Sequence, residues 1–203
     1  MTRLVSLAAL DFSYVTAPEM TRLEELDIGG LKEWSPIVAP NLTQLVCRCS
    51  IGDSVNDYVN LEFLKMDFPS REKHVISLPN LRALEFPKLV VTGDFTGSVN
   101  LERLLLKYPF FGCRFKVPPT ITNMTLAIGF DLDDVLKTVS ELPLTRLDIL
   151  KSALSDDVLK VFAGITSLQM LSFKHAATSH KPFMESLARL TQLKVLDLVH
   201  KKY

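Results

Sequence analysis

Hydrophobic positions along this chain follow one short phrase, L-x-x-L-x-L, which recurs ten times from end to end. The phrases begin at Leu4, Leu23, Leu42, Leu61, Leu81, Leu101, Ile121, Leu144, Leu168 and Leu193. Subtracting each first position from the next gives spacings of 19, 19, 19, 20, 20, 20, 23, 24 and 25 residues. Self-similarity with a period near 20 residues is the signature of a solenoid. We therefore assign residues 1–203 to a single repeat domain in which stacked repeats share one core.

Each phrase predicts a short strand. Its fourth and sixth residues are apolar and alternate with polar or variable ones, which is the pattern of a strand with one buried face. The first residue of the phrase lies before the strand and is also expected to point inward. Consecutive strands would stack in parallel about 4.8 Å apart. Parallel strands need a returning connection, and the rest of each repeat must supply it.

The returning segments change character along the chain. In the repeats that start from Leu4 to Leu101, 19–20 residues leave little room for a helix, and segments such as Trp34–Pro36 favour extended or 3₁₀ turns. The later segments are longer and predict helices. Three apolar sets carry this prediction, each preceded by residues suited to a helix N-terminus: Val135, Leu136, Val139 and Leu142 after Asp131–Asp134; Val158, Leu159 and Phe162 after Ser155–Asp157; Phe183, Met184, Leu187 and Leu190 after Lys181–Pro182. The convex side should broaden, and the curvature should rise, toward the C-terminus.

The chain resembles the leucine-rich repeat family over essentially its whole length. Besides the ten phrases, the resemblance rests on segments that look like the family's usual approach to the repeat strand: Pro40-Asn41-Leu42, Val59-Asn60-Leu61, Pro79-Asn80-Leu81 and Val99-Asn100-Leu101. It implies an α/β solenoid, a horseshoe with about ten parallel concave strands. Extended or 3₁₀ returns are expected in its N-terminal part and short helices in its C-terminal part.

One departure from the family is plain. The asparagine or cysteine that the family commonly has three residues past the third apolar position is absent, so the chain resembles an irregular subfamily. In the family this asparagine ladder satisfies buried backbone groups, so another device must do so here. Val117–Ile121 resembles short bacterial and protist repeats, whereas Leu154–Leu159 looks more like the helical repeats of F-box-type and plant resistance proteins. The subfamily stays open between them.

Composition narrows the classes of function. The 23 basic and 23 acidic residues cancel, which argues against nucleic-acid binding, because that usually needs a basic surface. No apolar run approaches the roughly 18 residues of a transmembrane helix, and no signal-peptide segment precedes the first repeat, so no membrane insertion is expected. The three cysteines are an odd number, which favours a reducing compartment. We expect an intracellular protein, in the cytoplasm, with an organelle left open.

Alternation places three residues of each repeat on the concave face. Neighbouring repeats then bring Arg48 beside Asp67 and Lys65 beside Glu85, pairs that solubilise the sheet without explaining its function. Apolar side chains among the charges are more informative, because a concave sheet has no other layer to cover them. We predict a partner-binding surface that is centred on Phe63, Arg103, Leu105 and Lys107 and includes Lys65, Glu85, Arg146, Asp148 and Met170. The alternative is that Phe63, Leu105, Leu150 and Met170 are ordinary scattered surface hydrophobics.

Candidate chemistry is sparse. Cys47 and Cys49 form a C-x-C pair without a second local pair for zinc, and His175, His180 and His200 lack a carboxylate that would orient a metal ligand. Phosphate-binding and nucleophile motifs are absent. The aromatic stretch Tyr108–Phe115 and Trp34 are interpreted as core rather than as a docking ridge. We expect no enzyme, no metal and no cofactor; a GTPase-activating role for Arg114 is the only catalytic alternative.

Three functions are compatible with this pattern. The leading hypothesis is a non-enzymatic module that binds a protein partner on its concave face. An alternative is a structural or scaffold subunit of a larger complex, because no polar caps are visible at the two ends and neighbouring subunits or missing chain would have to cover them. On that ground the isolated chain is expected to be poorly soluble or oligomeric. The second alternative is an F-box-type or immune-receptor-type recognition domain cut from a longer chain.

Overall fold

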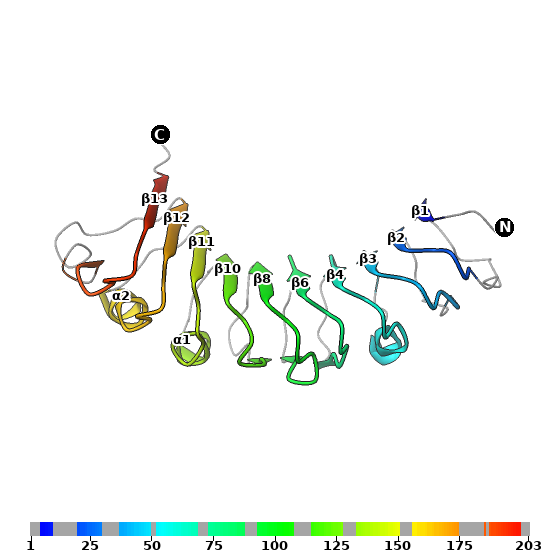
Figure 1. The fold of residues 1–203 in the computed structure, drawn as a ribbon, viewed down its shortest axis with the longest axis horizontal. Coiled ribbons are helices and arrows are strands. Elements are labelled where there is room, and N and C mark those ends of the chain that lie inside the picture. Colours follow the sequence, from blue (N-terminus) through cyan, green and yellow to red (C-terminus); the bar gives the residue numbers. More distant parts are fainter. Residues whose placement is uncertain are drawn as a thin grey trace.

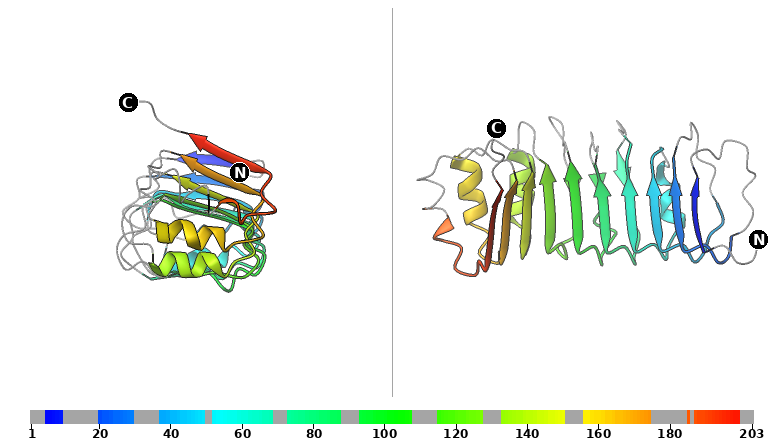
Figure 2. Two further views of the ribbon diagram at one scale, coloured as in Figure 1. Left: turned by 90° about the vertical axis from the view of Figure 1, so that its left-hand side faces the viewer. Right: turned by 90° about the horizontal axis from the view of Figure 1, so that it is seen from above.

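A computed structural model describes residues 5–9, 20–29, 37–49, 52–68, 73–87, 93–107, 115–127, 133–150, 156–174, 185 and 187–199. Ten parallel strands form one continuous sheet along the molecule, and Figures 1 and 2 show them side by side on the concave side of an arc. In sheet order these strands are β1 (Ser6–Ala9), β2 (Glu25–Ile28), β3 (Gln44–Cys47), β4 (Phe63–Met66), β6 (Ala83–Phe86), β8 (Arg103–Lys107), β10 (Asn123–Ala127), β11 (Arg146–Leu150), β12 (Met170–Lys174) and β13 (Val195–Val199). The fold is the predicted leucine-rich-repeat solenoid.

The register of the sheet follows the repeated phrase. Equivalent positions of neighbouring phrases pair directly, as Leu45 does with Leu64 and Leu104 with Met124. The three apolar positions of each phrase therefore form three columns that run through the core. The first column is fully buried from Leu23 to Leu168: Leu23, Leu42, Leu61, Leu81, Leu101, Ile121, Leu144 and Leu168 each have no exposed surface. Burial of these columns removes apolar surface from water along the whole arc, which is the main stabilising contribution to such a fold.

A tight turn precedes most strands, and the sequence explains it. In the turn Ala39–Leu42 the amide of Leu42 donates to the carbonyl of Ala39 at 3.1 Å, and Tyr58–Leu61, Leu78–Leu81 and Ser98–Leu101 close in the same way. Proline or valine occupies the second position of these four turns and asparagine the third. Proline is favoured at the second position of a β-turn because its φ is already fixed there. We call these segments the pre-strand turns.

The asparagines of the pre-strand turns link neighbouring repeats. The Nδ2 of Asn60 donates to the Pro40 carbonyl at 2.8 Å, and that of Asn80 donates to the Val59 carbonyl at 3.1 Å. Asn41 and Asn100 donate in the same way to the carbonyls of Thr21 and Pro79. Each bond runs to the second residue of the preceding turn. A ladder of asparagine side chains thus exists in this chain, but it stands before the strands, whereas the family's usual ladder follows them.

The convex side of the N-terminal half has the expected extended and 3₁₀ returns. A 3₁₀ helix, η1 (Gly52–Asp57), is followed by three two-residue strands: β5 (His74–Val75), β7 (Gly93–Asp94) and β9 (Phe115–Lys116). These strands pair in parallel to form a second, narrow sheet, which the sequence did not predict. Between the two sheets lies a row of buried rings. Phe68 meets His74 edge-on, His74 meets Phe86, and Phe86 stacks on Phe95 with ring centres 5.4 Å apart.

Helices replace the extended returns farther along, as predicted. They are α1 (Asp133–Ser140) and α2 (Asp156–Ala163), and Figure 1 shows both on the convex side beneath the C-terminal strands. Val135, Val139 and Phe162 turn toward the core and are nearly fully buried. Figure 1 shows the sheet rising at both ends, from β3 to β1 as well as from β11 to β13, so the curvature is not confined to the C-terminal part as the sequence predicted. Of the third predicted helix only residues 185 and 187–190 are described, and its Leu187 and Leu190 pack against the core as predicted. Trp34 lies outside the described residues, and so does most of Tyr108–Phe115; Phe115 itself is buried, as expected.

Candidate functional site

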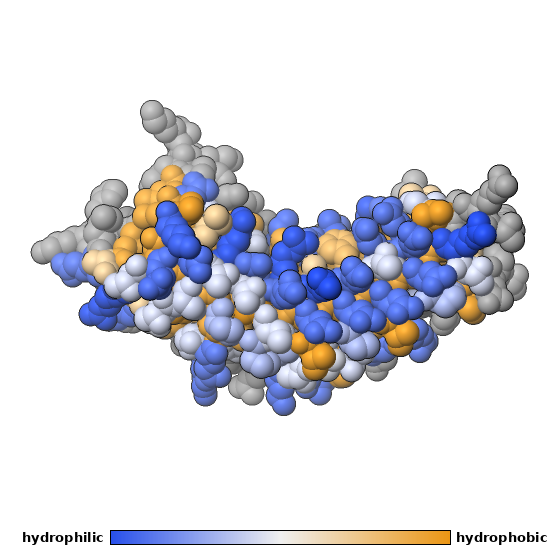
Figure 3. Space-filling model, viewed as in Figure 1, coloured by the Kyte–Doolittle hydropathy of each residue, from blue (hydrophilic) through white to orange (hydrophobic). Residues whose placement is uncertain are grey.

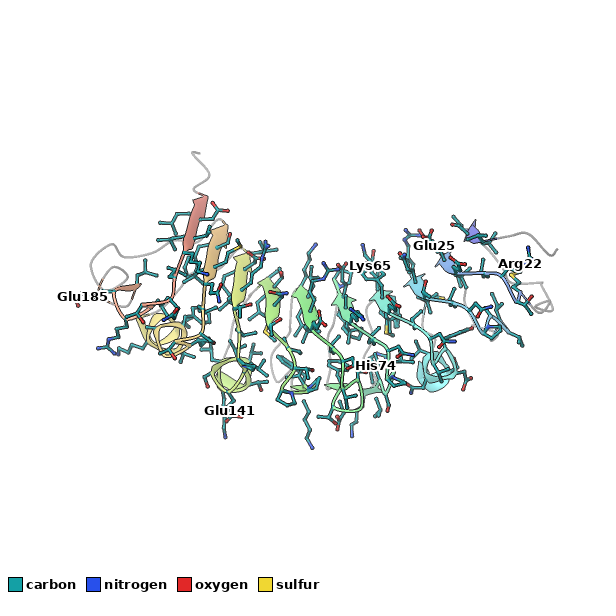
Figure 4. The ribbon with its side chains drawn as sticks, in the orientation of Figure 1. Arg22, Glu25, Lys65, His74, Glu141 and Glu185 are labelled. Atoms are coloured by element: carbon teal, nitrogen blue, oxygen red, sulfur yellow. The ribbon has the colours of Figure 1, made fainter. Side chains whose placement is uncertain are left out.

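The concave face of the ten-stranded sheet is the open face of the described structure. Helices α1, α2 and η1 lie on the opposite side, so none of the described elements covers it (Figures 1 and 2). Figure 4 shows Lys65 and Glu25 on the concave side, with Glu141 on the convex side and His74 between the layers. Figure 3 shows the concave side as a hollow between two raised ends, with a mostly hydrophilic middle.

The apolar residues predicted as anchors are partly covered by their neighbours. Phe63, Leu105, Leu150 and Met170 are each neither fully exposed nor buried. Parallel pairing places polar residues on the strands beside them. Leu105 of β8, for example, lies between Glu85 of β6 and Thr125 of β10. The result is a surface on which short apolar stretches alternate with charges rather than one apolar patch.

A pocket of about 290 Å³ lies on the concave face over β6, β8, β10 and β11. It is lined by Glu85, Arg103, Leu105, Asn123, Met124, Thr125, Arg146 and Asp148, and we call it the concave pocket. Five of these residues, Glu85, Arg103, Leu105, Arg146 and Asp148, belong to the nine predicted from sequence. Phe63, Lys65, Lys107 and Met170 lie on the same sheet but do not line the pocket.

The charged side chains of the concave pocket differ in how deeply they are buried. Arg103 and Arg146 occupy equivalent positions on either side of Asn123, and both are exposed. Asp148 is only 9% exposed. One of its oxygens, Oδ2, accepts from Nε of Arg146 at 2.9 Å and from the Thr125 hydroxyl at 3.4 Å. The other oxygen, Oδ1, is buried and finds no hydrogen-bond donor among the described residues. The pocket therefore combines a buried carboxylate with guanidinium groups at its rim.

Lateral ion pairs join neighbouring strands beside the pocket. Lys65 Nζ lies 4.0 Å from a Glu85 oxygen, which is the pair expected from the repeat. Arg48 makes a two-point contact with Asp27 of the preceding strand, at 2.7 and 3.0 Å, which the sequence did not predict. Both pairs are partly exposed, so each contributes only about 0–1 kcal/mol to stability. They hold side chains in place on the face more than they stabilise the fold.

Sequence reasoning missed the polar lining of the pocket. Asn123 and Thr125 are short, uncharged side chains on β10, and nothing in the isolated sequence distinguishes them from other surface residues. Their position in the repeat could have indicated them. The register places Asn123 between Arg103 and Arg146, and Thr125 between Leu105 and Asp148. Asp148 was predicted on the exposed surface, but the structure buries most of it beside the exposed Arg146.

The cysteine pair is buried and reduced. Cys47 and Cys49 are free thiols whose sulfur atoms lie 3.3 Å apart. The hydrogen bond with Cys49, together with burial, raises the pKa of the Cys47 thiol, and the same bond lowers the pKa of Cys49. Among the described residues no group of three or more His, Cys, Asp and Glu side chains is placed to hold a metal ion. His175, His180, His200, Cys113 and Arg114 lie outside the described residues.

These features define the protein as a solenoid of the leucine-rich-repeat type with an open concave sheet. No family model and no curated protein matches the chain. Two solved structures with a similar course of the chain are internalins of Listeria monocytogenes. One, inlF, is 16% identical, with 97% of this chain and 67% of that chain covered and a TM-score of 0.47. The other, internalin C2, is 18% identical, with 96% and 80% covered and a TM-score of 0.45.

Both TM-scores lie below 0.5. The repeat and the sheet that it forms define the fold of this chain. The described part of the chain contains no helix with the length and hydrophobicity that crossing a bilayer requires.

Proposed function

We propose that this protein is a non-enzymatic interaction module that binds a protein partner on its concave face. The observation that carries the proposal is the concave pocket, which gathers five of the nine predicted residues on an open sheet. Solenoids present extended concave surfaces of this kind to their partners. Mixed charges beside half-buried Leu105 and Phe63 also resemble the composition of an interface, in which a few apolar or arginine anchors are surrounded by polar groups.

A fixed place in a larger assembly is the second candidate. Apolar side chains of β13 favour it, since Val195, Leu196 and Leu198 are 43%, 39% and 50% exposed. Figure 3 shows an apolar patch over this part of the surface. In this role the contacts would be made by the side of β13 rather than by the concave pocket. The two candidates therefore predict different sensitive surfaces.

The test is affinity purification from cells that express the protein, with paired variants as bait. Phe63→Ala combined with Arg103→Glu alters the concave face without touching the core columns. Val75→Ala combined with Lys116→Glu makes a matched change on the convex sheet, where both residues are exposed. Captured proteins are quantified by mass spectrometry, and circular dichroism verifies that each bait is folded.

We expect a specific set of proteins to be retained by the wild type and by the convex variant. The concave variant should lose them about tenfold or more, because removal of interface anchors commonly costs more than 1 kcal/mol each. Equal capture by all three baits would refute the concave assignment. A fourth bait, Leu198→Glu in β13, tests the assembly role, and loss of the captured proteins with this bait alone would favour that role instead.

A further inference from the structure

We infer that the concave pocket receives a lysine side chain of the protein partner, with Asp148 as its principal acceptor. The inference rests on the proposed function, because it names the chemistry by which the concave face recognises its partner. The structural basis is Asp148, a pocket-lining residue whose side chain is only 12% exposed and one of whose two carboxylate oxygens is buried with no donor among the described residues.

A buried carboxylate oxygen requires a donor. An ionised carboxylate accepts through both oxygens, and leaving one of them unsatisfied in a buried position is costly. Arg146 and Thr125 both bind Oδ2, so neither serves Oδ1. An incoming group that satisfies Oδ1 must therefore be a donor, and a cationic donor gains most from the carboxylate charge.

The surroundings of Asp148 fit the rest of a lysine side chain. Leu105 lines the pocket two strands away and offers an apolar wall for the methylene groups. Glu85, on the far side of Leu105, adds a second carboxylate. Lysine fits better than arginine, because a compact ammonium group on a flexible stem needs less room beside Asp148 than a planar guanidinium fork, and Oδ2 keeps its bond from the Thr125 hydroxyl. Arg103 and Arg146 at the rim can bind backbone carbonyls or acidic residues that flank the lysine.

We take Arg146 to be the side chain that moves when the lysine binds. Oδ1 is buried in the unbound protein, so the ammonium group reaches it only when a covering side chain turns aside. The Arg146 side chain is 49% exposed and touches Asp148 through Nε, so it can rotate toward solvent. Arg146 and the incoming lysine then compete for the same carboxylate. A lysine ligand should therefore bind more weakly when Asp148 is neutralised and more tightly when Arg146 is neutralised. An acidic ligand should show the opposite effects.

The experiment uses random peptides displayed on phage, selected on the wild-type protein. Enriched peptides are synthesised and their affinities measured by fluorescence anisotropy against wild type, Asp148→Asn and Arg146→Gln. Asp197→Asn is the matched control, because Asp197 accepts from Ser172 in β12 as Asp148 accepts from Thr125, but it is exposed. Each peptide is also made with its lysine acetylated, and urea unfolding verifies that every variant is folded. Glu85→Gln is the second carboxylate variant if Asp148→Asn does not fold.

We expect enriched peptides to share a lysine whose acetylation weakens binding about tenfold or more. Asp148→Asn should weaken binding by a similar factor, Arg146→Gln should strengthen it and Asp197→Asn should leave it unchanged. Peptides that bind the concave face with no lysine in common would overturn the inference and keep the proposed function. Stronger binding to Asp148→Asn with weaker binding to Arg146→Gln would assign the pocket to an acidic group instead. Failure to enrich any peptide sensitive to Phe63→Ala or Arg103→Glu would count against both.

Discussion

Single hydrogen bonds from asparagine side chains connect the pre-strand turns of neighbouring repeats. Asn60 and Asn80 each donate to the carbonyl of the second residue of the preceding turn. The ladder typical of leucine-rich repeats is missing from the sequence, and the bonds of Asn60 and Asn80 are exposed, so they do not take over its role of satisfying buried backbone groups. The position of these asparagines was visible as the repeated Pro/Val-Asn-Leu segment, but their bonding partners were not, because each acceptor carbonyl lies 20 or 21 residues away.

We predict that Asn80→Ala lowers the free energy of unfolding by about 1 kcal/mol, the usual net contribution of one hydrogen bond. The bond that is lost runs from Asn80 Nδ2 to the Val59 carbonyl. Urea denaturation measures the change. Asn123→Ala is the control, because that side chain lies on the open concave face rather than at a turn. Equal effects of the two substitutions would show that the turn ladder does not stabilise the fold.

Tyr58 makes the folding stability of the protein depend on pH in the alkaline range. Its hydroxyl donates to the Ile37 carbonyl at 3.0 Å and accepts from the Ile37 amide at 3.1 Å. Burial raises the pKa of Tyr58 to about 12, from an ordinary value of 10.0. Between pH 10 and 12 the unfolded chain loses this proton while the folded chain keeps it, so stability falls as pH rises and levels off above 12.

We expect Tyr58 to account for a loss of about 2–3 kcal/mol across this range, since one pKa unit corresponds to about 1.4 kcal/mol. Urea unfolding at a series of pH values measures it. Lysine side chains titrate in the same range, so the informative quantity is the difference from Tyr58→Phe, which lacks the ionising hydroxyl. If both proteins lose stability in parallel, Tyr58 is not the cause.

Asp148 shows where residue-scale prediction ends. Alternation correctly puts it on the concave side of β11. Its depth depends on how the longer side chains of Arg146 and its neighbours fold over it, and a one-letter pattern does not specify rotamers. The buried carboxylate and the pocket around it therefore required the structure.

Among the elements, the concave strands were predictable and the convex sheet was not. Each concave strand has apolar residues at alternate positions, as in β3 with Leu45 and Cys47 inward. The convex strands β5, β7 and β9 contain two residues each, which is too short for any alternation to be recognised. Helices α1 and α2 were predictable because acidic residues precede an apolar stripe of helical period.

The convex sheet depends on close packing at Gly93. A Cβ added to Gly93 of β7 would collide with the ring of Phe95, which is fully buried and stacked on Phe86. Because that ring has no free space, we predict that Gly93→Ala destabilises the protein by about 1–3 kcal/mol, the usual cost of overpacking.

Thermal or urea unfolding checks the Gly93→Ala prediction. Val75→Ala on the neighbouring strand β5 is the control, because Val75 is 42% exposed and surface substitutions usually change stability by less than about 0.5 kcal/mol. A Gly93→Ala protein as stable as Val75→Ala would mean that the ring row tolerates an added methyl group.

At the scale of the whole molecule, the ten-stranded sheet forms an arc with two raised ends. Helices α1 and α2 lie beneath the strands that rise at the C-terminal end, and the sheet also rises toward β1 at the other end (Figure 1). The concave pocket lies over β6 to β11, between the two raised ends of the arc. A partner that spans the arc would contact the pocket near its centre.

The concave face is tested most directly by site-specific photo-crosslinking. A benzophenone side chain is placed at Leu105 in the concave pocket or, as control, at Val75 on the convex sheet. Both baits are irradiated in the cells that express the protein, and covalent adducts are identified by mass spectrometry. We predict a defined protein adduct from position 105 that is absent from position 75 and is suppressed by Arg103→Glu. The same adducts from both positions, or adducts from position 75 alone, would contradict it.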